Sequence, residues 1–393
     1  MIEFPPGFEW GVATSAHQIE GGNWNSDWWR FEHTEGSGCA EPSGDACDSY
    51  NRFAEDAALV ADLGFTHYRF SIEWSRIEPE RGEFSRAALD HYRRCCETLK
   101  SLGIEPVVTF HHFTSPRWLA DEGGWESPTV AARFARYCEK SARSLDGLMS
   151  RACTINEPNI VSFCGWQLGV FPPGRPRDRD ARHKVNANFV QAHRLAVEAI
   201  RSAAPGVPVG LTLSMTDYQA VEGGEDRLQH VRRRMEDEFL DAVEGDDFFG
   251  VQAYTRQRIG PEGALKLADG VPVTQMGYEF WPEALGEVLR RAWTYTGGSV
   301  PLLVTENGIG TTNDTERIEY VSRALGCVRD ALADGLDVRG YTYWSLLDNF
   351  EWLFGYEPRF GLVGVDRDTF ARTPKPSAFW LGNIARSNGI GPA

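Results

Sequence analysis

The chain has 393 residues, of which 42% are hydrophobic and 12% aromatic, so it can bury a large core. Its formal net charge of −16 opposes binding to phosphate backbones and to anionic membranes, and no dense lysine or arginine stripe offsets that charge. Composition therefore argues against nucleic acids and membrane surfaces as partners.

The first residues and the cysteines indicate an unexported protein. The N-terminus lacks the basic region and following apolar stretch of a signal peptide. No run of about 18 uncharged apolar residues, as a membrane-spanning helix needs, occurs in the sequence. The eight cysteines are scattered, and Cys95 and Cys96 are neighbours on an expected helix, which favours reduced thiols. No C-x-x-C pair is present, so a zinc site is not expected. We expect a soluble, cytoplasmic protein with neither metal nor cofactor.

Segments with strand composition alternate along the chain with segments of helical periodicity. Strands are predicted at 8–15, 66–74, 106–113, 152–156, 207–215, 248–254, 301–305 and 338–345. Helices are predicted at 50–63, 87–102, 129–145, 185–203, 226–243, 282–295 and 315–333. Eight such alternations favour an α/β fold of the closed (β/α)₈ TIM barrel type. A doubly wound open sheet is the alternative, but it would more often carry a Gly-rich phosphate turn after its first strand.

No low-complexity or Pro/Ser-rich linker divides the chain, so one barrel domain over residues 1–393 is expected. Catalytic residues in such barrels lie at the carboxyl ends of the strands. The polar and aromatic residues predicted there are Gln18, Arg69, His112, Asn156, Glu157, Tyr254, Glu306, Trp344, Glu351 and Trp352. Acids, amides and indoles suit a neutral sugar, because hydroxyls need paired donors and acceptors and the sugar face stacks on tryptophan.

Two carboxyl groups carry the strongest chemical signal. Glu157 lies in a TINEP string and Glu306 in a TENG string, and each string follows an apolar run that is predicted to be a strand. Either string alone is weak, because Asn, Gly and Pro are common turn formers. Glycoside hydrolysis needs one protonated carboxyl at the leaving oxygen and one ionised carboxyl at the sugar carbon. The pair at matched strand ends therefore indicates that reaction.

Several ordered motifs extend the signal over nearly the whole chain. They are FEWGVATSA (8–16), RFSIEWSRI (69–77), NEP (156–158), TENG (305–308), WSLLDNFEW (344–352), RFGL (359–362) and PKPSA (374–378). In these motifs the chain resembles glycoside hydrolase family 1, the β-glucosidase and β-galactosidase family. The resemblance implies a (β/α)₈ barrel that hydrolyses β-glycosides with retention of configuration, with Glu157 as acid/base and Glu306 as nucleophile.

The resemblance also assigns supporting residues. Retention requires the two carboxyl groups to lie about 5 to 5.5 Å apart, and the charge of Glu306 should keep Glu157 protonated at rest. Arg69 and Tyr254 match the family's partners of the nucleophile, although an ordinary barrel ion pair is the alternative for Arg69. Asn156 matches the donor to the sugar 2-hydroxyl. The remaining substrate-binding positions implied are Gln18, His112, Phe113, Trp344, Glu351, Trp352 and Phe360.

Two residues narrow the expected substrate. A carboxylate at Glu351 would repel a sugar phosphate, so an unphosphorylated glycoside is expected. Glu157 is a carboxyl where the thioglucosidases of this fold carry an amide, which favours an O-glycosidase. The expected ligand is a small β-glycoside or short oligosaccharide. The glycone, the leaving group (the aglycone) and the oligomeric state stay open.

The chain departs from the family pattern at several positions. Phe113 replaces a tryptophan, Gln252-Ala253-Tyr254 replaces Asn-Tyr-Tyr, and His17 replaces a tyrosine. The connection over 215–248 and the whole chain are short, from which we hypothesise an open aglycone side with loose specificity. Three aromatic residues are candidates to line that side, namely Trp166, Tyr278 and Trp281.

Two other functions remain as alternatives. An open acceptor side could favour transglycosylation at the same site. A non-catalytic glycan-binding barrel is less favoured, because such a protein would be expected to have lost a carboxyl or the Arg69 and Tyr254 supports, and none is lost.

Overall fold

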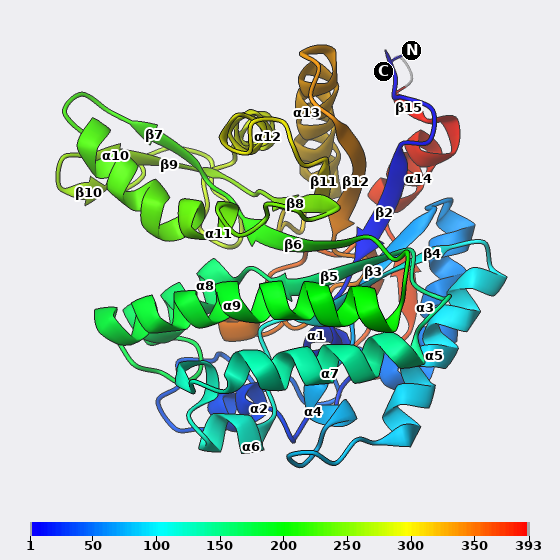
Figure 1. The fold of residues 1–393 in the computed structure, drawn as a ribbon. Helices are drawn as coiled ribbons and strands as arrows, with labels where there is room; N and C mark the ends of the chain where they lie inside the picture. Colours follow the sequence, from blue (N-terminus) through cyan, green and yellow to red (C-terminus); the bar gives the residue numbers. More distant parts are fainter. Residues whose placement is uncertain (1, 391–393) are drawn as a thin grey trace.

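The computed structural model describes residues 2–390 and contains a closed barrel of eight parallel strands (Figure 1). Around the barrel the strands follow the order β11-β12-β2-β3-β4-β5-β6-β8. Their bounds are β2 (Glu9–Ala13), β3 (His67–Ser71), β4 (Glu105–His111), β5 (Arg151–Asn156), β6 (Val209–Ser214), β8 (Phe248–Gln252), β11 (Leu302–Asn307) and β12 (Val338–Trp344). Each strand overlaps a predicted segment, and the predicted TIM barrel is confirmed.

The barrel strands are buried on both faces, because one face lines the barrel interior and the other packs against helices. β8 is buried along its whole length, and β6 along all but its last residue. Gly210 on β6 sits where a Cβ would overlap the carbonyl oxygen of Phe248, so this close approach requires glycine. Long apolar runs rather than alternating patterns therefore define these strands.

Long amphipathic helices cover the outside of the barrel (Figure 1). They are α3 (Ser49–Leu63), α5 (Arg86–Ser101), α7 (Val130–Ser144), α9 (Arg179–Ala203), α12 (Ala284–Tyr295), α13 (Asp314–Ala333) and α14 (Pro376–Ser387). Side chains of Ser85 and Asn313 accept backbone N–H bonds at the N-termini of α5 and α13. Six of these helices were predicted from periodicity, whereas α14 was not.

The helix predicted at 226–243 is interrupted. It consists of α10 (Glu225–Arg232), a π-helical turn η3 (Arg233–Asp237) and α11 (Glu238–Leu240). Glu236 in the π-helical turn is fully buried, where it accepts from the Thr216 backbone N–H at 3.1 Å and from Arg291 Nε at 2.7 Å. The wider turn places this carboxyl inside the protein, which a regular helical pattern does not predict.

Short elements in the loops were also not predicted. The helical ones are α1 (Ala16–Ile19), α2 (Asp27–Glu32), α4 (Trp74–Ile77), α6 (Arg117–Asp121), η1 (Gly124–Glu126), α8 (Pro158–Ser162), η2 (Phe163–Leu168) and η4 (Trp352–Phe354). A small sheet joins β7 (Asp217–Ala220), β9 (Arg256–Gly260) and β10 (Gly263–Ala264), so the connection over 215–248 carries a strand of its own. Further pairs are β13 (Val363–Val365) with β14 (Arg372–Pro374), and β1 (Ile2–Glu3) with β15 (Gly389–Ile390).

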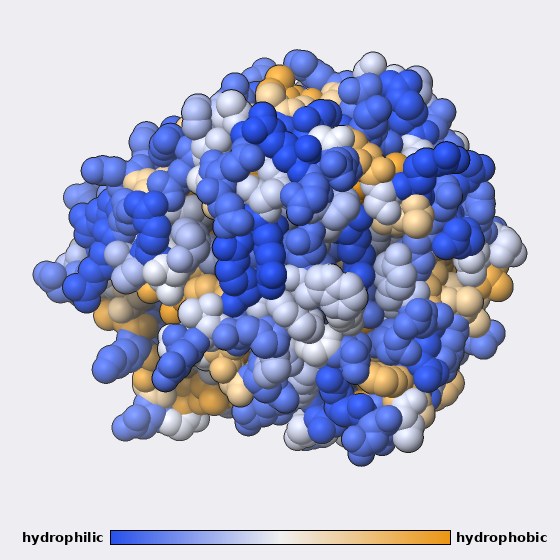
Figure 2. All heavy atoms as spheres, turned by 90° about the horizontal axis from the view of Figure 1, so that it is seen from below, coloured by the Kyte–Doolittle hydropathy of each residue, from blue (hydrophilic) through white to orange (hydrophobic). Residues whose placement is uncertain are grey.

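One face of the molecule is mainly polar. The face in Figure 2 is largely hydrophilic, and its hydrophobic side chains gather in separate patches. Within residues 2–390 no helix combines the length and hydropathy needed to cross a membrane. The same residues contain no group of three or more His, Cys, Asp or Glu side chains arranged to hold a metal ion.

Candidate active site

A cavity of about 410 Å³ lies among the carboxyl ends of the barrel strands and the loops that follow them. Every residue predicted to be catalytic or to bind the sugar lines it, with the exception of Arg69. These lining residues are Gln18, His112, Phe113, Asn156, Glu157, Tyr254, Glu306, Trp344, Glu351, Trp352 and Phe360. Residues far apart in the sequence are thus brought to one cavity, and Arg69 lies directly behind it in contact with Glu306.

Glu306, on β11, is surrounded by hydrogen-bond donors. Arg69 Nη1 donates to its Oε1 at 2.5 Å, and the Tyr254 hydroxyl donates to its Oε2 at 2.7 Å. The Arg69 and Glu306 side chains are only 1% and 5% exposed. Burial raises the pKa of Glu306, whereas the guanidinium and the phenol oppose the rise because they stabilise the carboxylate. The two donors favour the ionised form of Glu306 and fix the orientation of its carboxyl group.

Arg69 also holds Asn156, at the end of β5. Its Nη2 donates to Asn156 Oδ1 at 2.6 Å, and the Thr212 hydroxyl donates to the same oxygen at 3.2 Å. Both contacts identify this atom as the amide oxygen, so the amide nitrogen lies toward His112 Nε2, at 3.3 Å. Burial lowers the pKa of His112 well below its ordinary value, and the Arg69 charge lowers it further, so the imidazole is neutral.

Glu157, directly after β5, has a different environment. A neutral amide forms a hydrogen bond with its carboxyl group. Gln252 Nε2 donates to Glu157 Oε1 at 2.7 Å. The Thr305 hydroxyl donates to Gln252 Oε1 at 3.2 Å, which fixes the orientation of that amide. Burial, followed by the charge of Glu306, raises the pKa of Glu157 to about 8. A pKa of about 8 keeps Glu157 protonated at neutral pH, and of the two carboxyl groups it is Glu306 whose negative charge is stabilised by the Arg69 and Tyr254 donors.

Gln252 was recognised in the sequence as a departure from the family pattern but not as a site residue. Its position gave a usable signal, since it precedes Tyr254 by two residues. Positions i and i+2 at the end of a strand point to the same side, so both side chains reach the pair of carboxyl groups.

Three lining residues have a strained backbone. Phe113, Glu157 and Trp352 have φ angles of 71°, 45° and 54°, in the left-handed region that non-glycine residues rarely adopt. Such conformations persist only where the surrounding structure enforces them, and they concentrate at functional sites. Here they turn the chain immediately after β5, shortly after β4 and at the start of η4 in the loop after β12.

The inner end of the cavity combines amide, carboxyl and aromatic groups. Gln18 accepts from the Ser15 hydroxyl at 2.6 Å and donates to the Phe350 carbonyl at 2.8 Å, which leaves its amide beside Glu351 at 3.4 Å. Burial, then the Glu306 charge, raises the pKa of Glu351 to about 8. The Trp352 ring is parallel to that of His17, with ring centroids 5.5 Å apart.

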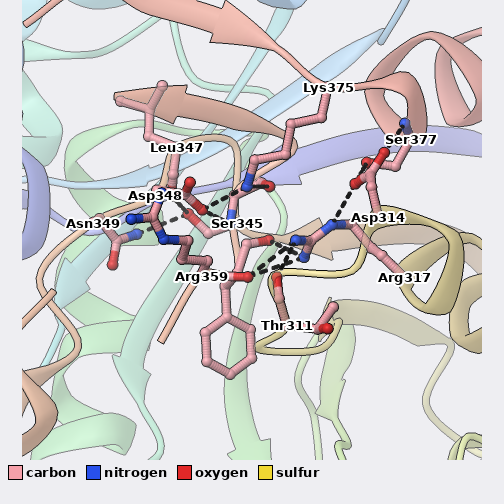
Figure 3. Close-up of polar contacts among 12 residues, drawn as sticks. Thr311, Asp314, Arg317, Ser345, Leu347, Asp348, Asn349, Arg359, Lys375 and Ser377 are labelled. Atoms are coloured by element: carbon pink, nitrogen blue, oxygen red, sulfur yellow. Dashed lines mark hydrogen bonds and ion pairs between the residues drawn. The ribbon is translucent and has the colours of Figure 1, made fainter. Parts of the chain in front are cut away.

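The loop after β12, which carries Glu351 and Phe360, is fixed by a buried polar network (Figure 3). Arg317 on α13 donates to the carbonyl oxygens of Thr311, Arg359 and Phe360 at 2.8 to 3.2 Å. Lys375 Nζ donates to Asp348 Oδ1 at 2.8 Å, and the same oxygen accepts from the Gly361 N–H at 2.8 Å. Arg317 and Lys375 therefore fix the conformation of the loop that carries Glu351 and Phe360.

The expectation for the aglycone side is only partly met. Tyr278 lines the cavity and is 39% exposed. Trp166 and Trp281 do not line it, so that part of the expectation is wrong: Trp166 is buried with its indole N–H on Glu126, at 2.8 Å, and Trp281 packs against the Arg256 guanidinium. Sequence reasoning missed the apolar lining residues Ile160, Phe163, Leu168, Val170, Met276 and Phe354.

Comparison with known proteins settles the family. A sequence model of "Glycosyl hydrolase family 1" matches residues 1–244 and 252–390. The chain belongs to glycosyl hydrolase family 1. It is a retaining β-glycosidase, and the enzyme class predicted from the two carboxyl strings is confirmed.

Relatives of this family 1 enzyme match it along nearly their whole lengths. Thermostable beta-glucosidase B of Thermobispora bispora is 35% identical, over 99% of this chain and 92% of that protein. A crystal structure of a beta-glycosidase is 48% identical, covers 99% of both chains and superposes with a TM-score of 0.91. The beta-glucosidase of Thermotoga maritima in complex with deoxynojirimycin is 31% identical, with a TM-score of 0.91 over the whole of both chains.

Proposed function

We propose that Glu306 is the nucleophile and Glu157 the acid/base in hydrolysis of unphosphorylated β-glycosides. The observation that carries the proposal is the unequal environment of two carboxyl groups in one cavity. Glu306 receives a guanidinium and a phenol donor, whereas Glu157 receives a neutral amide and has its pKa raised to about 8. One group is thereby prepared to attack and the other to donate a proton.

The first half-reaction uses both groups at once. Glu157 gives its proton to the glycosidic oxygen as Glu306 attacks the anomeric carbon, so the alcohol leaves and a glycosyl ester of Glu306 forms. Esterification removes the negative charge beside Glu157, whose pKa falls, and it can then take a proton from water. That water attacks the anomeric carbon, releasing Glu306 and a sugar of unchanged configuration.

The inner end of the cavity supplies the groups that hold the sugar. Asn156 is placed beside Glu306 through Arg69, which supports its role as donor to the 2-hydroxyl. Gln18, His112 and Glu351 offer polar atoms for the other hydroxyls, and the rings of Trp344 and Trp352 offer stacking surfaces. The Thermotoga maritima neighbour in complex with deoxynojirimycin supports a sugar-sized ligand for this pocket.

The cavity is unsuited to a phosphorylated sugar. Burial raises the pKa of Glu351 to about 8, so at neutral pH this carboxyl group is mainly protonated and its charge is not what excludes phosphate. Among the described residues that line the cavity there is no lysine or arginine, whereas there are three glutamates. A phosphate dianion would therefore lose its hydration without gaining a cationic partner.

Hydrolysis is favoured over transfer because the relatives are named as glucosidases and a glucohydrolase.

We also propose that residues 1–393 form one catalytic domain. We place the protein in the cytoplasm, because eight free and largely buried thiols suit a reducing compartment.

A panel of chromogenic β-glycosides tests the proposal. The wild type should release the chromophore, and proton NMR of the reaction mixture should detect the β-anomer of the sugar first. Glu306→Ala should lose activity by at least about 10⁴-fold, since the covalent step is removed. Appearance of the α-anomer first, or an active Glu306→Ala enzyme, would refute the mechanism.

A further inference from the structure

The cavity has two chemically different ends. The inner end holds polar residues that are nine-tenths or more buried, among them Gln18, Asn156 and Glu306. The outer end is formed by seven residues that we call the apolar mouth: Ile160, Phe163, Leu168, Val170, Met276, Tyr278 and Phe354. Burial decreases from the inner end to the mouth, where Leu168, Phe354 and Tyr278 are 47%, 42% and 39% exposed.

Three separate parts of the fold supply the apolar mouth. α8 with η2 and the residues that follow them contribute Ile160 to Val170, the segment after β10 contributes Met276 and Tyr278, and η4 contributes Phe354. Large hydrophobic side chains from unrelated loops thus meet around one opening. Exposed hydrophobic residues are usually scattered singly over a protein surface. A cluster of them around one opening therefore indicates a binding site.

The apolar mouth offers little to a second sugar. A sugar unit at this position would bring several hydroxyl groups, and each needs a donor or acceptor to replace water. Apart from the groups of the inner end, the described polar residues lining the cavity here are Ser214, Cys164 and the phenol of Tyr278. An alkyl or aryl group, in contrast, would gain from contact with the same side chains.

A neighbouring hollow of about 400 Å³ extends the opening. It shares Ile160, Phe163, Ser214, Tyr254 and Tyr278 with the cavity, and it continues beside the β7–β9–β10 sheet. Its lining includes polar groups, but also Met235, Leu265, Leu267 and Val271. A group longer than a single ring can therefore extend from the mouth without leaving the protein surface.

We propose that the apolar mouth binds the leaving group, and that the preferred substrates are β-glycosides of alkyl alcohols or phenols rather than β-linked disaccharides. This inference rests on the proposed function, since the leaving alcohol must depart from the side on which Glu157 donates its proton. It replaces the hypothesis of an open aglycone side with loose specificity by a chemical preference.

A series of n-alkyl β-glycosides with one sugar tests the preference. From ethyl to hexyl the alcohols have similar pKa values, so the acid/base chemistry stays constant while apolar surface increases. We expect kcat/KM to rise about two- to fourfold for each added methylene. The hexyl glycoside should also exceed the corresponding β-linked disaccharide. A flat series, or a disaccharide with the higher kcat/KM, would overturn the proposal.

Two variants and a small substrate separate this inference from the proposed function. The double variant Leu168→Asn with Phe354→Asn should lower the ratio of kcat/KM for the hexyl glycoside to that for the β-glycosyl fluoride by about tenfold. Phe379→Asn, at a somewhat more exposed position on α14, should leave the ratio unchanged. A double variant with the wild-type ratio would contradict the apolar mouth, whereas failure of the wild type to cleave the fluoride, whose leaving group cannot reach the mouth, would contradict the proposed function instead.

Discussion

In the proposed mechanism Glu306 and Glu157 have opposite roles because their neighbours differ. Glu306 contacts Arg69 and Tyr254, whereas Glu157 contacts Gln252. The two carboxyl groups, and the roles proposed for them, are recognisable in the sequence as short strings at strand ends. The position of Gln252, two residues before Tyr254, indicates that its side chain faces the site, but the hydrogen bond to Glu157 was not predictable because a Thr305 hydroxyl from the adjacent strand fixes the orientation of the amide.

Removing the Gln252 donor should change the proton affinity of Glu157. The Gln252 hydrogen bond stabilises the ionised form and so lowers the pKa, against the burial that raises it to about 8. In Gln252→Met, which keeps the volume but not the donor, the pKa should rise further. We expect the basic limb of the kcat/KM profile, measured from pH 6 to 10 with an alkyl glycoside, to move to higher pH. Gln252→Asn serves as the control that retains a donor, and a limb that stays in place or moves to lower pH in Gln252→Met would contradict this role.

At the scale of elements, periodicity and strand composition predicted the barrel and six of its long outer helices. The small β7–β9–β10 sheet, the π-helical turn at η3 and the shape of the loop after β12 were not predictable. Their conformations depend on partners distant in sequence. Arg317, for example, reaches from α13 to carbonyl groups of a loop more than forty residues away, as Figure 3 shows.

Replacement of Arg317 should affect both folding and substrate binding. Arg317→Met leaves several buried carbonyl groups and Asp314 without their partner, so the free energy of unfolding should fall by about 3 kcal/mol or more. KM should rise because the loop carrying Glu351 and Phe360 loses its anchor. Urea unfolding and steady-state kinetics measure the two effects.

Arg329→Met provides the matched control on the same helix. Within residues 2–390, Arg329 pairs only with the neighbouring Asp330, and both side chains are exposed, so the loss should stay below about 1 kcal/mol. Equal effects of the two substitutions would show that the Arg317 network does not fix the loop.

At the scale of the whole molecule, several buried carboxyl groups bind protons more tightly in the folded protein than in the unfolded chain. Burial raises the pKa of Glu20 and Asp27 to about 7, and that of Glu157 and Glu351 to about 8. Between their unfolded and folded pKa values the native state holds more protons, so its stability falls as pH rises. Histidines with lowered pKa act in the opposite direction, but only below their unfolded pKa of 6.5; they are His67, His91, His111 and His112.

Above pH 6.5 the histidines no longer oppose the carboxyl groups, and the buried thiols, whose pKa is also raised, act in the same direction as the carboxyl groups. We expect calorimetry to give a lower Tm at pH 8.5 than at pH 6.5. The double variant Glu157→Gln with Glu351→Gln should show a smaller decrease, because two of the titrating groups are gone. A Tm that increases with pH in this window would mean that these carboxyl groups are not held in their neutral form.

The roles of the two carboxyl groups are tested most directly by the products that azide forms with the two alanine variants. In Glu306→Ala, azide can occupy the space of the lost nucleophile and attack once, so an activated β-glycoside should give the α-glycosyl azide. In Glu157→Ala, Glu306 still forms the glycosyl ester and azide replaces water, so the product should be the β-glycosyl azide. Proton NMR distinguishes the two anomers. The same anomer from both variants, or the reverse assignment, would contradict the account.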